Sequence, residues 1–147
     1  MIAPSDQVLS VEMFGGESPA VFMKREQHRE KTIELLKQLK NDSMFTDVTL
    51  ASEDGINIKA HRAIIGYSSP YMFSILQGHK ESDGPLVLPV KYKQLYSLLE
   101  YIYLGESKVD VIEVNNFLRM GNNLQIRGLW NGQNIKPCMK IEKTSWG

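Results

Sequence analysis

The dipeptide Asp54-Gly55 constrains the fold of this chain more than any other short feature. Before it lies FTDVTLA at residues 45–51, which is rich in β-forming residues, and after it lies INIKA at 56–60, which alternates apolar and polar side chains. Asp-Gly between two such runs is the strongest short hairpin signal, because glycine accepts the positive φ of a tight turn. The sequence therefore predicts a β-hairpin across residues 45–60.

A narrow apolar stripe marks a helix before this hairpin, at residues 28–40. Ile33, Leu36 and Leu39 recur at three-residue spacing, and charged side chains occupy many of the other positions. A stripe of this width covers one partner surface and does not support burial on every side. We expect this helix to lie against a single neighbouring surface.

Two short helices are predicted directly after the hairpin. The first covers residues 62–67, and the second begins with Ser69, a favoured N-cap residue, and Pro70, which suits the first helical position. The second helix is expected to run to Leu76. After a polar loop, a compact strand is predicted at residues 86–88.

The second half of the chain is predicted to be mainly helical. Residues 90–104 have the clearest helical pattern in the chain, with Gly105 at the C-cap position. A further helix is expected at 113–121 and one more turn at 124–129, while the run KVDV at 108–111 is a candidate short strand. These elements predict an α/β fold of the α+β type, with a small mixed sheet and clustered short helices.

The two ends of the chain differ from its centre. Residues 1–19 are rich in small and polar residues and are interpreted as a flexible leader, followed at 20–24 by an isolated candidate strand. Residues 131–147 show no regular spacing of apolar residues and are interpreted as a tail. A chain of 147 residues suits one domain, and we place that domain at residues 20–130.

Composition argues against several classes of partner. Lysine plus arginine and aspartate plus glutamate number 17 each, so net charge gives no reason to expect direct binding of nucleic acid or of an anionic membrane. The single cysteine, Cys138, excludes an internal disulfide. No apolar run approaches the roughly 20 residues of a membrane helix, and the N-terminus lacks the pattern of a signal peptide. These features predict a nuclear or cytosolic protein.

His61 and Arg62 are the strongest candidates for chemistry, as a general base beside an anion-binding group. A base needs a reactive proton within hydrogen-bond reach, and the nearby serines lie in GYSSP, outside the G-x-S-x-G pattern that exposes a nucleophile. Ser69 is better explained as a helix cap. His61 is therefore predicted to bond to backbone at a strand-helix junction, and we expect no catalysis, no metal site and no cofactor.

Asp47 is harder to explain, because it lies in an otherwise apolar strand. A buried carboxylate is costly unless it is paired, and the next strand ends near the cation Arg62. The structural interpretation is an Asp47–Arg62 pair. The functional interpretation is a charged pocket on a binding surface, and the two are compatible.

In order and spacing, these segments resemble the BTB/POZ domain. The run FTDVTLASEDGINIKAHRAIIGYSSPYMFSIL is similar to that domain's D-V/L-T-L, hairpin, A-H-R/K, short apolar helix and S-P-Y/F. The run LLEYIYLGESKVDVIEVNNFLRMGNNLQIRGL resembles its C-terminal half, and AVFMKREQH resembles the Tramtrack-type subgroup of insect transcription and chromatin proteins. The resemblance covers roughly residues 20–130. It implies an interaction module without catalysis.

The resemblance also implies a homodimer with exchanged strands. Family members pack the first helix and the helix after A-H-R against the partner, which corresponds here to Ile33, Leu36, Leu39, Ala63, Ile64 and Tyr67. In many members an N-terminal strand crosses to the partner's late strand, so that Val21, Phe22 and Met23 would pair with Lys108, Val109 and Val111 of the other chain. Asp47 and Arg62 match the family's charged pocket.

The sequence departs from the Tramtrack-type pattern at two places. These departures argue against the higher-order assembly of that subgroup more than against the fold or the dimer. Arg25 stands where a tryptophan is usual, and Gly121-Asn122 stands where Ala-Glu is usual. Gly121 is expected to weaken its helix by about 0.5–1 kcal/mol relative to alanine, unless close packing requires a glycine there.

The leading functional hypothesis is a self-associating module of a transcription or chromatin regulator. Its partners would be a second copy, other BTB domains or co-regulator peptides, and DNA would be bound by elements outside this segment. The alternative is a substrate adaptor for a cullin-type ubiquitin ligase, which usually needs a helical extension after the last helix. The short, aperiodic tail beyond residue 130 favours the first hypothesis.

Overall fold

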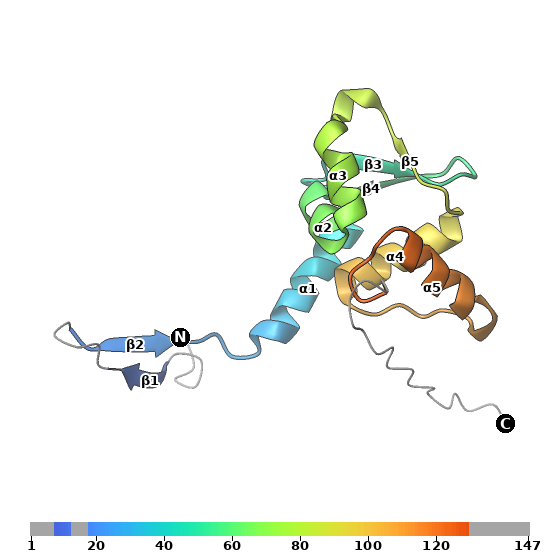
Figure 1. The fold of residues 1–147 in the computed structure, drawn as a ribbon. Coiled ribbons are helices and arrows are strands. Elements are labelled where there is room, and N and C mark those ends of the chain that lie inside the picture. Colours follow the sequence, from blue (N-terminus) through green and yellow to red (C-terminus); the bar gives the residue numbers. More distant parts are fainter. Residues whose placement is uncertain (1–7, 13–17, 130–147) are drawn as a thin grey trace.

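The structure is a computed structural model of the chain, and it describes residues 8–12 and 18–129 (Figure 1). The strands are β1 (Val8–Glu12), β2 (Ala20–Met23), β3 (Val48–Ala51), β4 (Asn57–Ala60) and β5 (Leu86–Val87). The helices are α1 (His28–Asn41), α2 (Arg62–Ser68), α3 (Pro70–Gly78), α4 (Tyr92–Leu104) and α5 (Val114–Asn123), with short 3-10 turns at Glu81–Asp83 and Val111–Glu113. This order of elements confirms the predicted α/β fold.

A three-stranded mixed sheet with the order β4-β3-β5 lies beside helices α2 to α5. β3 and β4 form the predicted antiparallel hairpin, in which Leu50 lies opposite Ile58, and Gly55 supplies the positive φ of 83°. β5 joins β3 in parallel, with Leu86 opposite Leu50. Because partners in register point to the same face, Leu50, Ile58 and Leu86 share one side of the sheet.

The core forms where this side of the sheet meets the helices. β3, α2, α3, α4 and the segment after α5 each contribute apolar side chains that are almost fully buried: Leu50, Ile65, Met72, Leu95 and Ile126. The Ser69 hydroxyl accepts the Met72 N–H at 3.0 Å, and Pro70 follows as the first residue of α3. This confirms the predicted helix start, and the Ser69 hydroxyl also donates to the Leu124 carbonyl at 2.5 Å.

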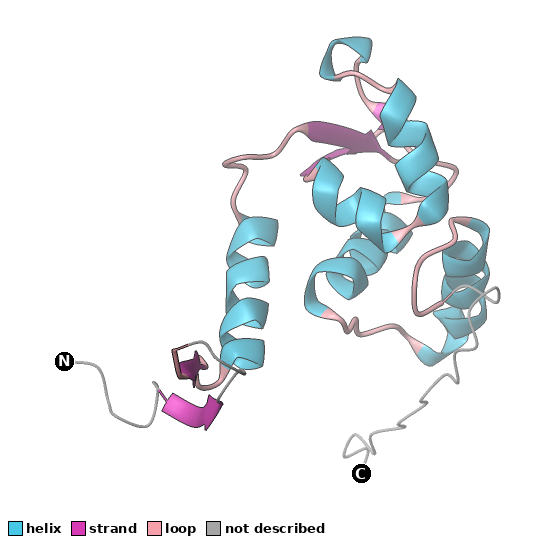
Figure 2. Ribbon diagram, turned by 60° about the vertical axis from the view of Figure 1, so that its left-hand side comes forward, coloured by secondary structure: helices cyan, strands magenta, loops and turns pink. Residues whose placement is uncertain are grey.

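The N-terminal region, made of β1, β2 and α1, forms an arm that leaves this body. β2 pairs with β1 in antiparallel register from Val8↔Met23 to Glu12↔Ala20. Figures 1 and 2 both place this hairpin at the far end of α1, away from the sheet and the other helices. No side chain of α1 is buried, and its contact with the body is mainly with α4. Residues 8–12, which lie within the expected leader, thus form β1, and the β2 strand is not isolated.

Two predictions in the C-terminal half are wrong. No strand forms at 108–111: Lys108 and Val109 lie in an irregular loop, and Val111 begins a 3-10 turn. A strand needs a neighbour to pair with, and this segment pairs with none of the described strands. The turn expected at 124–129 is also not helical, because the chain reverses through the positive φ angles of Gln125 (52°) and Gly128 (96°).

Close packing explains the glycine at position 121. A Cβ there would lie 2.5 and 2.6 Å from the Cδ1 and Cβ atoms of Leu129, which is closer than real carbon contacts allow. The Gly121 carbonyl also accepts the Ile126 N–H at 2.8 Å. The segment after α5 therefore folds directly onto Gly121, and the conformational cost of a glycine in the helix is offset by this packing.

Candidate functional site: an apolar interaction surface

His61, the candidate base, is enclosed in a buried hydrogen-bond network. Its backbone N–H donates to the Tyr103 hydroxyl at 3.0 Å, its Nδ1 lies 2.7 Å from the same oxygen, and its Nε2 lies 3.4 Å from the Met44 carbonyl. Burial raises the pKa of Tyr103 to about 12, so the phenol stays protonated. The ring has structural partners on both nitrogens and none of them is a nucleophile. Sequence reasoning missed Tyr103 because it lies 42 residues away.

Asp47 and Arg62 meet, but not as the predicted pair of opposite charges. Asp47 is exposed, which corrects the expectation of burial, and its Oδ1 accepts the Arg62 backbone N–H at 2.7 Å. This places a carboxylate at the N-terminus of α2, where His61 provides no side-chain cap. The Arg62 guanidinium donates to backbone carbonyls: Nε to that of Asp47 at 3.3 Å, Nη1 to that of Leu76 at 2.7 Å and Nη2 to that of His79.

The contact of Asp47 and Arg62 therefore joins elements of the fold, and the charged pocket stays a prediction. The carboxylate ties β3 to the start of α2, and the guanidinium ties α2 to the end of α3, where a cation is favoured by the helix dipole. An ion pair joins Lys93 and Asp110, at 3.6 Å between two exposed side chains. Exposed pairs of this kind contribute little.

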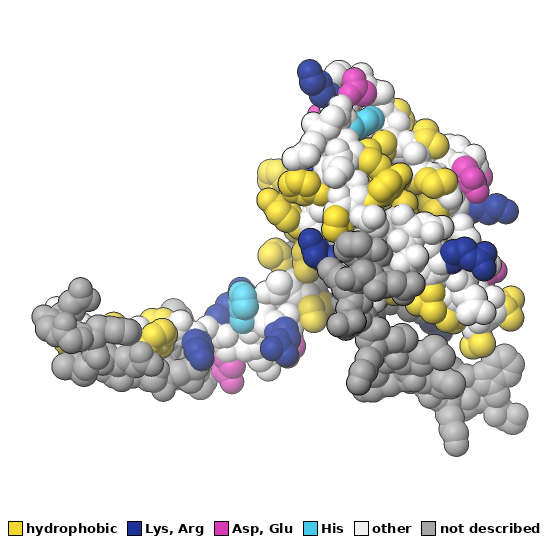
Figure 3. Space-filling view, viewed as in Figure 1, with side chains coloured by type: hydrophobic (Ala, Val, Ile, Leu, Met, Phe, Trp, Pro, Cys, Tyr) yellow, Lys and Arg dark blue, Asp and Glu magenta, His cyan; other side chains and the backbone are white. Residues whose placement is uncertain are grey.

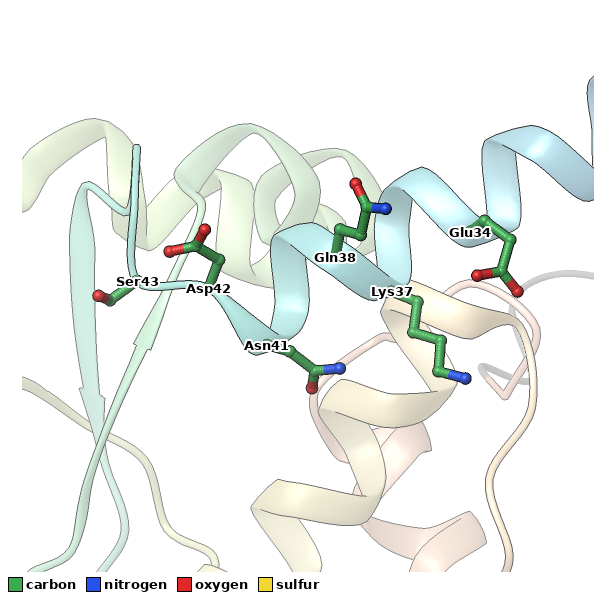
Figure 4. Close-up of a pocket in the computed structure, with 6 residues that line it drawn as sticks. All are labelled: Glu34, Lys37, Gln38, Asn41, Asp42 and Ser43. Atoms are coloured by element: carbon green, nitrogen blue, oxygen red, sulfur yellow. The ribbon is translucent and has the colours of Figure 1, made fainter.

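A shallow depression follows the outer side of α1 (Figure 4). Its lining is polar and comes from one helix and the loop after it: Glu34, Lys37, Gln38, Asn41, Asp42 and Ser43. The depression is open, and no described residues bring three potential metal ligands together there or elsewhere. It has neither the enclosure nor the nucleophile and base of an active site.

The predicted interface residues lie on two separate parts of the molecule. On β2, Val21, Phe22 and Met23 are 47%, 41% and 62% exposed. On α1 and α2 the predicted residues are exposed or half-buried: Ile33, Leu36, Leu39, Ala63, Ile64 and Tyr67. Leu39 and Ile64 also pack against the core, so each already has partners within its own chain.

Several exposed apolar residues were missed by sequence reasoning. Met44 and Phe45, 62% and 81% exposed, form the turn between α1 and β3, whereas FTDV had been interpreted as strand. Phe73 on α3 is partly exposed beside Tyr67, with 5.7 Å between the ring centroids. Val111 and Ile112 are 87% and 86% exposed. A positive φ at Phe45 ends the strand pattern, and no sequence signal of a glycine or asparagine marks it.

None of the described helices has both the length and the apolar character that crossing a membrane requires. The exposed apolar side chains named above are distributed over a hairpin, a turn and short helices, and charged residues separate them along α1.

Comparison with known proteins now gives the family. A profile of the BTB/POZ domain matches residues 36–136. Protein tramtrack, alpha isoform, of Drosophila melanogaster is 36% identical over 111 residues, which are 75% of this chain and 14% of that protein. The Longitudinals lacking protein-like of the same organism is 31% identical over 109 residues, or 74% of this chain and 85% of that protein.

A solved structure has the same fold. The BTB domain of human Gigaxonin superposes with a TM-score of 0.61 over 75% of this chain and 91% of that one, at 17% sequence identity. The chain thus spans a small part of Tramtrack and most of the shorter relative and of the Gigaxonin domain. From the profile match, the identities above 30% and the common fold it follows that this chain belongs to the BTB/POZ domain family, a family of protein-interaction modules and not of enzymes.

Proposed function

We propose that this chain is the homodimerisation module of a nuclear transcription or chromatin regulator. BTB domains mediate self-association and partner binding, and the similarity to Tramtrack supports the regulatory and nuclear role. The observation that carries the proposal is the N-terminal arm, which presents apolar side chains that the rest of the described chain leaves uncovered.

The arm lacks the support that an isolated hairpin needs. A two-stranded hairpin is marginally stable in water unless a further strand or a helix packs against it. In β2, Val21, Phe22 and Met23 remain exposed, and α1 contributes no buried residue. A second copy related by a two-fold axis would cover both arms at once, because each copy offers the other the same surface.

Helices α1 and α2 supply the central part of the proposed interface. Ile33 is 44% exposed and Tyr67 is 73% exposed, and Ala63 is exposed between them in sequence. Leu36 on α1 is half-buried, so it can contact the partner without leaving its own neighbours. Aromatic and aliphatic side chains of this kind dominate the energetic centre of interfaces.

We further propose the exchange of β2 between the copies. The strand would pair with Lys108, Val109 and Val111 of the second copy, a segment that forms neither helix nor strand up to residue 110. Pairing there would give that backbone a partner and close an open strand edge. Val111 is 87% exposed, so an apolar side chain is available to cover Val21–Met23.

Sedimentation velocity of the full chain at micromolar concentration tests the dimer, and a stable monomer overturns it. Ile33→Asp is expected to dissociate the dimer, because an unpaired charge is costly in a buried contact, and Ile33 is exposed enough for the monomer to remain folded. Gln38→Asp is the matched control, because it adds the same charge on the polar outer side of the same helix.

Deletion of residues 1–23 tests the exchanged strand separately. It is expected to weaken the dimer and to leave the body folded, since β2 has no fully buried residue and none of its residues belongs to the core cluster. A dimer of unchanged affinity after the deletion rejects the exchange and leaves the α1 and α2 interface in place. Partners beyond a second copy, namely other BTB domains or co-regulator peptides, would compete for or extend the same surface.

A further inference from the structure

The tip of the β3–β4 hairpin places Asp54-Gly55 against the start of helix α4. The Asp54 Oδ1 accepts the N–H of Tyr92, the first residue of α4, at 2.9 Å. Figure 3 shows acidic and basic side chains close together at the surface near this tip, which lies at the right of the body in Figure 1. A carboxylate 38 residues away in sequence thus satisfies one of the N–H groups that a helix leaves without a partner in its first turn.

The hairpin turn is closed around the same two residues. The Gly55 N–H donates to the Ser52 carbonyl at 3.0 Å, and the Ser52 N–H donates to the Ile56 carbonyl at 2.9 Å. Gly55 has a φ of 83°, and nothing lies within 4 Å of a Cβ built on it. Asp54 and Gly55 are both exposed. Water therefore reaches this peptide bond, while hydrogen bonds hold both the carboxylate and the glycine nitrogen.

An Asp-Gly pair is the place where a peptide chain rearranges most readily. The glycine nitrogen has no adjacent side chain to hinder it, so it can attack Cγ of the preceding aspartic acid. A bond forms between this nitrogen and Cγ, and the amide proton leaves with the carboxyl hydroxyl as water, which gives a five-membered succinimide. Water then opens the ring: cleavage of the new N–Cγ bond restores aspartate, and cleavage of the original peptide bond gives isoaspartate. Nothing is oxidised or reduced.

Both reacting groups must give up a hydrogen bond before the ring can close. Hydrogen bonds with the Ser52 side chain and with the Tyr92 N–H lower the pKa of Asp54 below its ordinary value, so the carboxyl group stays ionised at neutral pH. An ionised carboxylate is a poor electrophile, because it repels the nucleophile and has no hydroxyl group to leave as water. The rate of rearrangement therefore follows the fraction of chains in which the tip has opened away from α4.

We propose that Asp54-Gly55 is a site of isoaspartate formation that the start of α4 shields. Isoaspartate lengthens the main chain by a methylene group and carries its free carboxylate on a different carbon, so it does not maintain both the turn and the contact with Tyr92. A modified chain thus loses the link between the hairpin and α4, the helix that contributes Leu95, Leu98 and Leu99 to the core. The site lies outside the proposed dimer interface, so the inference is independent of the oligomeric state.

A second Asp-Gly pair in the same chain serves as an internal reference. Asp83 is exposed, and Gly84 has a φ of 82°, close to the 83° of Gly55. The Asp83 Oδ2 accepts the Lys80 N–H at 2.8 Å, three residues away within its own short turn. The two pairs share their sequence and their glycine conformation. They differ in whether a helix elsewhere in the chain holds the carboxylate.

Tyr92→Pro removes the donor and keeps the helix. Proline has no N–H and suits the first helical position, and Lys91 before it already has the extended conformation that proline requires, with φ −78° and ψ 157°. Tyr92→Ala is the matched control, because it removes the same ring and keeps the N–H. Isoaspartate at Asp54 is expected to form about two- to tenfold faster in Tyr92→Pro than in Tyr92→Ala, which corresponds to the loss of one hydrogen bond. The rate at Asp83 is expected to be the same in both.

The rates are measured on the full chain during incubation at neutral pH. Mass spectrometry with electron-transfer fragmentation distinguishes isoaspartate from aspartate at each pair, and a synthetic peptide of residues 51–58 gives the rate without a fold. Wild type is expected to react at Asp54 more slowly than the peptide does and more slowly than at Asp83. Asp54→Glu is expected to give no product at this position, because glutamate would have to close a six-membered ring.

Each outcome decides for or against the shielded site. A wild-type rate at Asp54 equal to that of the peptide overturns the shielding, and so do equal rates in Tyr92→Pro and Tyr92→Ala. A Tyr92→Pro chain that forms no isoaspartate at Asp54, after the peptide has reacted, overturns the site itself. If Tyr92→Pro unfolds, which a faster reaction at Asp83 reveals, the comparison of wild-type Asp54 with the peptide and with Asp83 still decides.

Discussion

The body and the N-terminal arm of this molecule are stabilised in different ways. In the body, β3, α2, α3 and α4 each bury apolar side chains, and the buried Ser69 and His61 are hydrogen-bonded within the chain. In the arm, α1 has no fully buried side chain and β2 exposes three consecutive apolar residues. The body is therefore stabilised mainly by its own core, whereas the arm leaves much of its apolar surface exposed.

The largest effect on folding is therefore expected in the body. Leu50→Ala removes a side chain that is 1% exposed at the centre of the sheet, and it should lower the free energy of unfolding by about 2–5 kcal/mol. Leu35→Ala on α1, where the side chain is 57% exposed, should change it by less than about 0.5 kcal/mol in the monomer. Urea unfolding at low concentration measures both, and equal losses would contradict the contrast between body and arm.

The next effect concerns the segment that folds back after α5. Gly121→Ala places a Cβ 2.5 Å from the Cδ1 of Leu129, so the segment must shift, at a cost of about 1–3 kcal/mol in the free energy of unfolding. Gly78→Ala is the matched control at the end of α3, because nothing lies within 4 Å of its Cβ. A stabilised Gly121→Ala variant would show that helix propensity outweighs the packing at this position.

A pH dependence is expected from the buried phenol of Tyr103. Burial raises its pKa to about 12 in the folded chain, above an ordinary value of about 10. Folding therefore favours the neutral phenol. The stabilisation of the folded chain by Tyr103 is complete below pH about 10. Raising the pH to about 12 removes up to about 3 kcal/mol of it. Tyr103→Phe removes this group.

Denaturant unfolding from pH 8 to pH 12 would measure the difference between wild type and Tyr103→Phe. The variant should be less stable at pH 8 by about 1–3 kcal/mol, because the His61 backbone N–H loses its acceptor. The two stabilities should then converge with rising pH. Parallel curves would mean that Tyr103 ionises as easily in the folded chain as in the unfolded one.

Local features of the body were predictable because neighbouring residues cause them. Gly55 permits the hairpin turn, Ser69 and Pro70 start α3, and Gly105 ends α4 with a φ of 77°. Contacts between distant residues were not predictable in detail. The Arg62 guanidinium bonds to carbonyls at the end of α3, and His61 bonds to Tyr103. Each side chain could reach several polar groups, and the tertiary packing determines which of them it bonds.

The arm and its surroundings show why surfaces are harder to predict than the core. β1 covers five residues, too few for a period to stand out from a polar leader. Phe45 continued the β-forming pattern of FTDV, yet the turn needs positive φ there, which local propensity would assign to glycine or asparagine. Residues 108–111 resemble a strand of the family, but they pair with none of the described strands, and pairing depends on contacts that the local sequence does not specify.

The smallest effect is expected where the arm meets the body. The Lys40 Nζ lies 4.4 Å from the ring centroid of Tyr96, which connects α1 to α4 at an exposed position. Lys40→Gln should cost about 0.5–1 kcal/mol or less, the range of an exposed cation–π contact. Lys37→Gln is the matched control, because Lys37 lines the outer depression of the same helix.

The global free energy of unfolding does not report the local effect of the Lys40–Tyr96 contact. Hydrogen exchange of individual amides is the better measurement. Because α1 buries no side chain, loosening its contact with α4 should speed exchange of the α1 amides and leave those of β3 and α4 unchanged. If the α1 amides exchange more slowly in the proposed dimer, in wild type and in Lys40→Gln alike, the second copy stabilises the arm more strongly than the body of the same chain does. Faster exchange throughout the body in Lys40→Gln would instead mean that arm and body unfold as one unit.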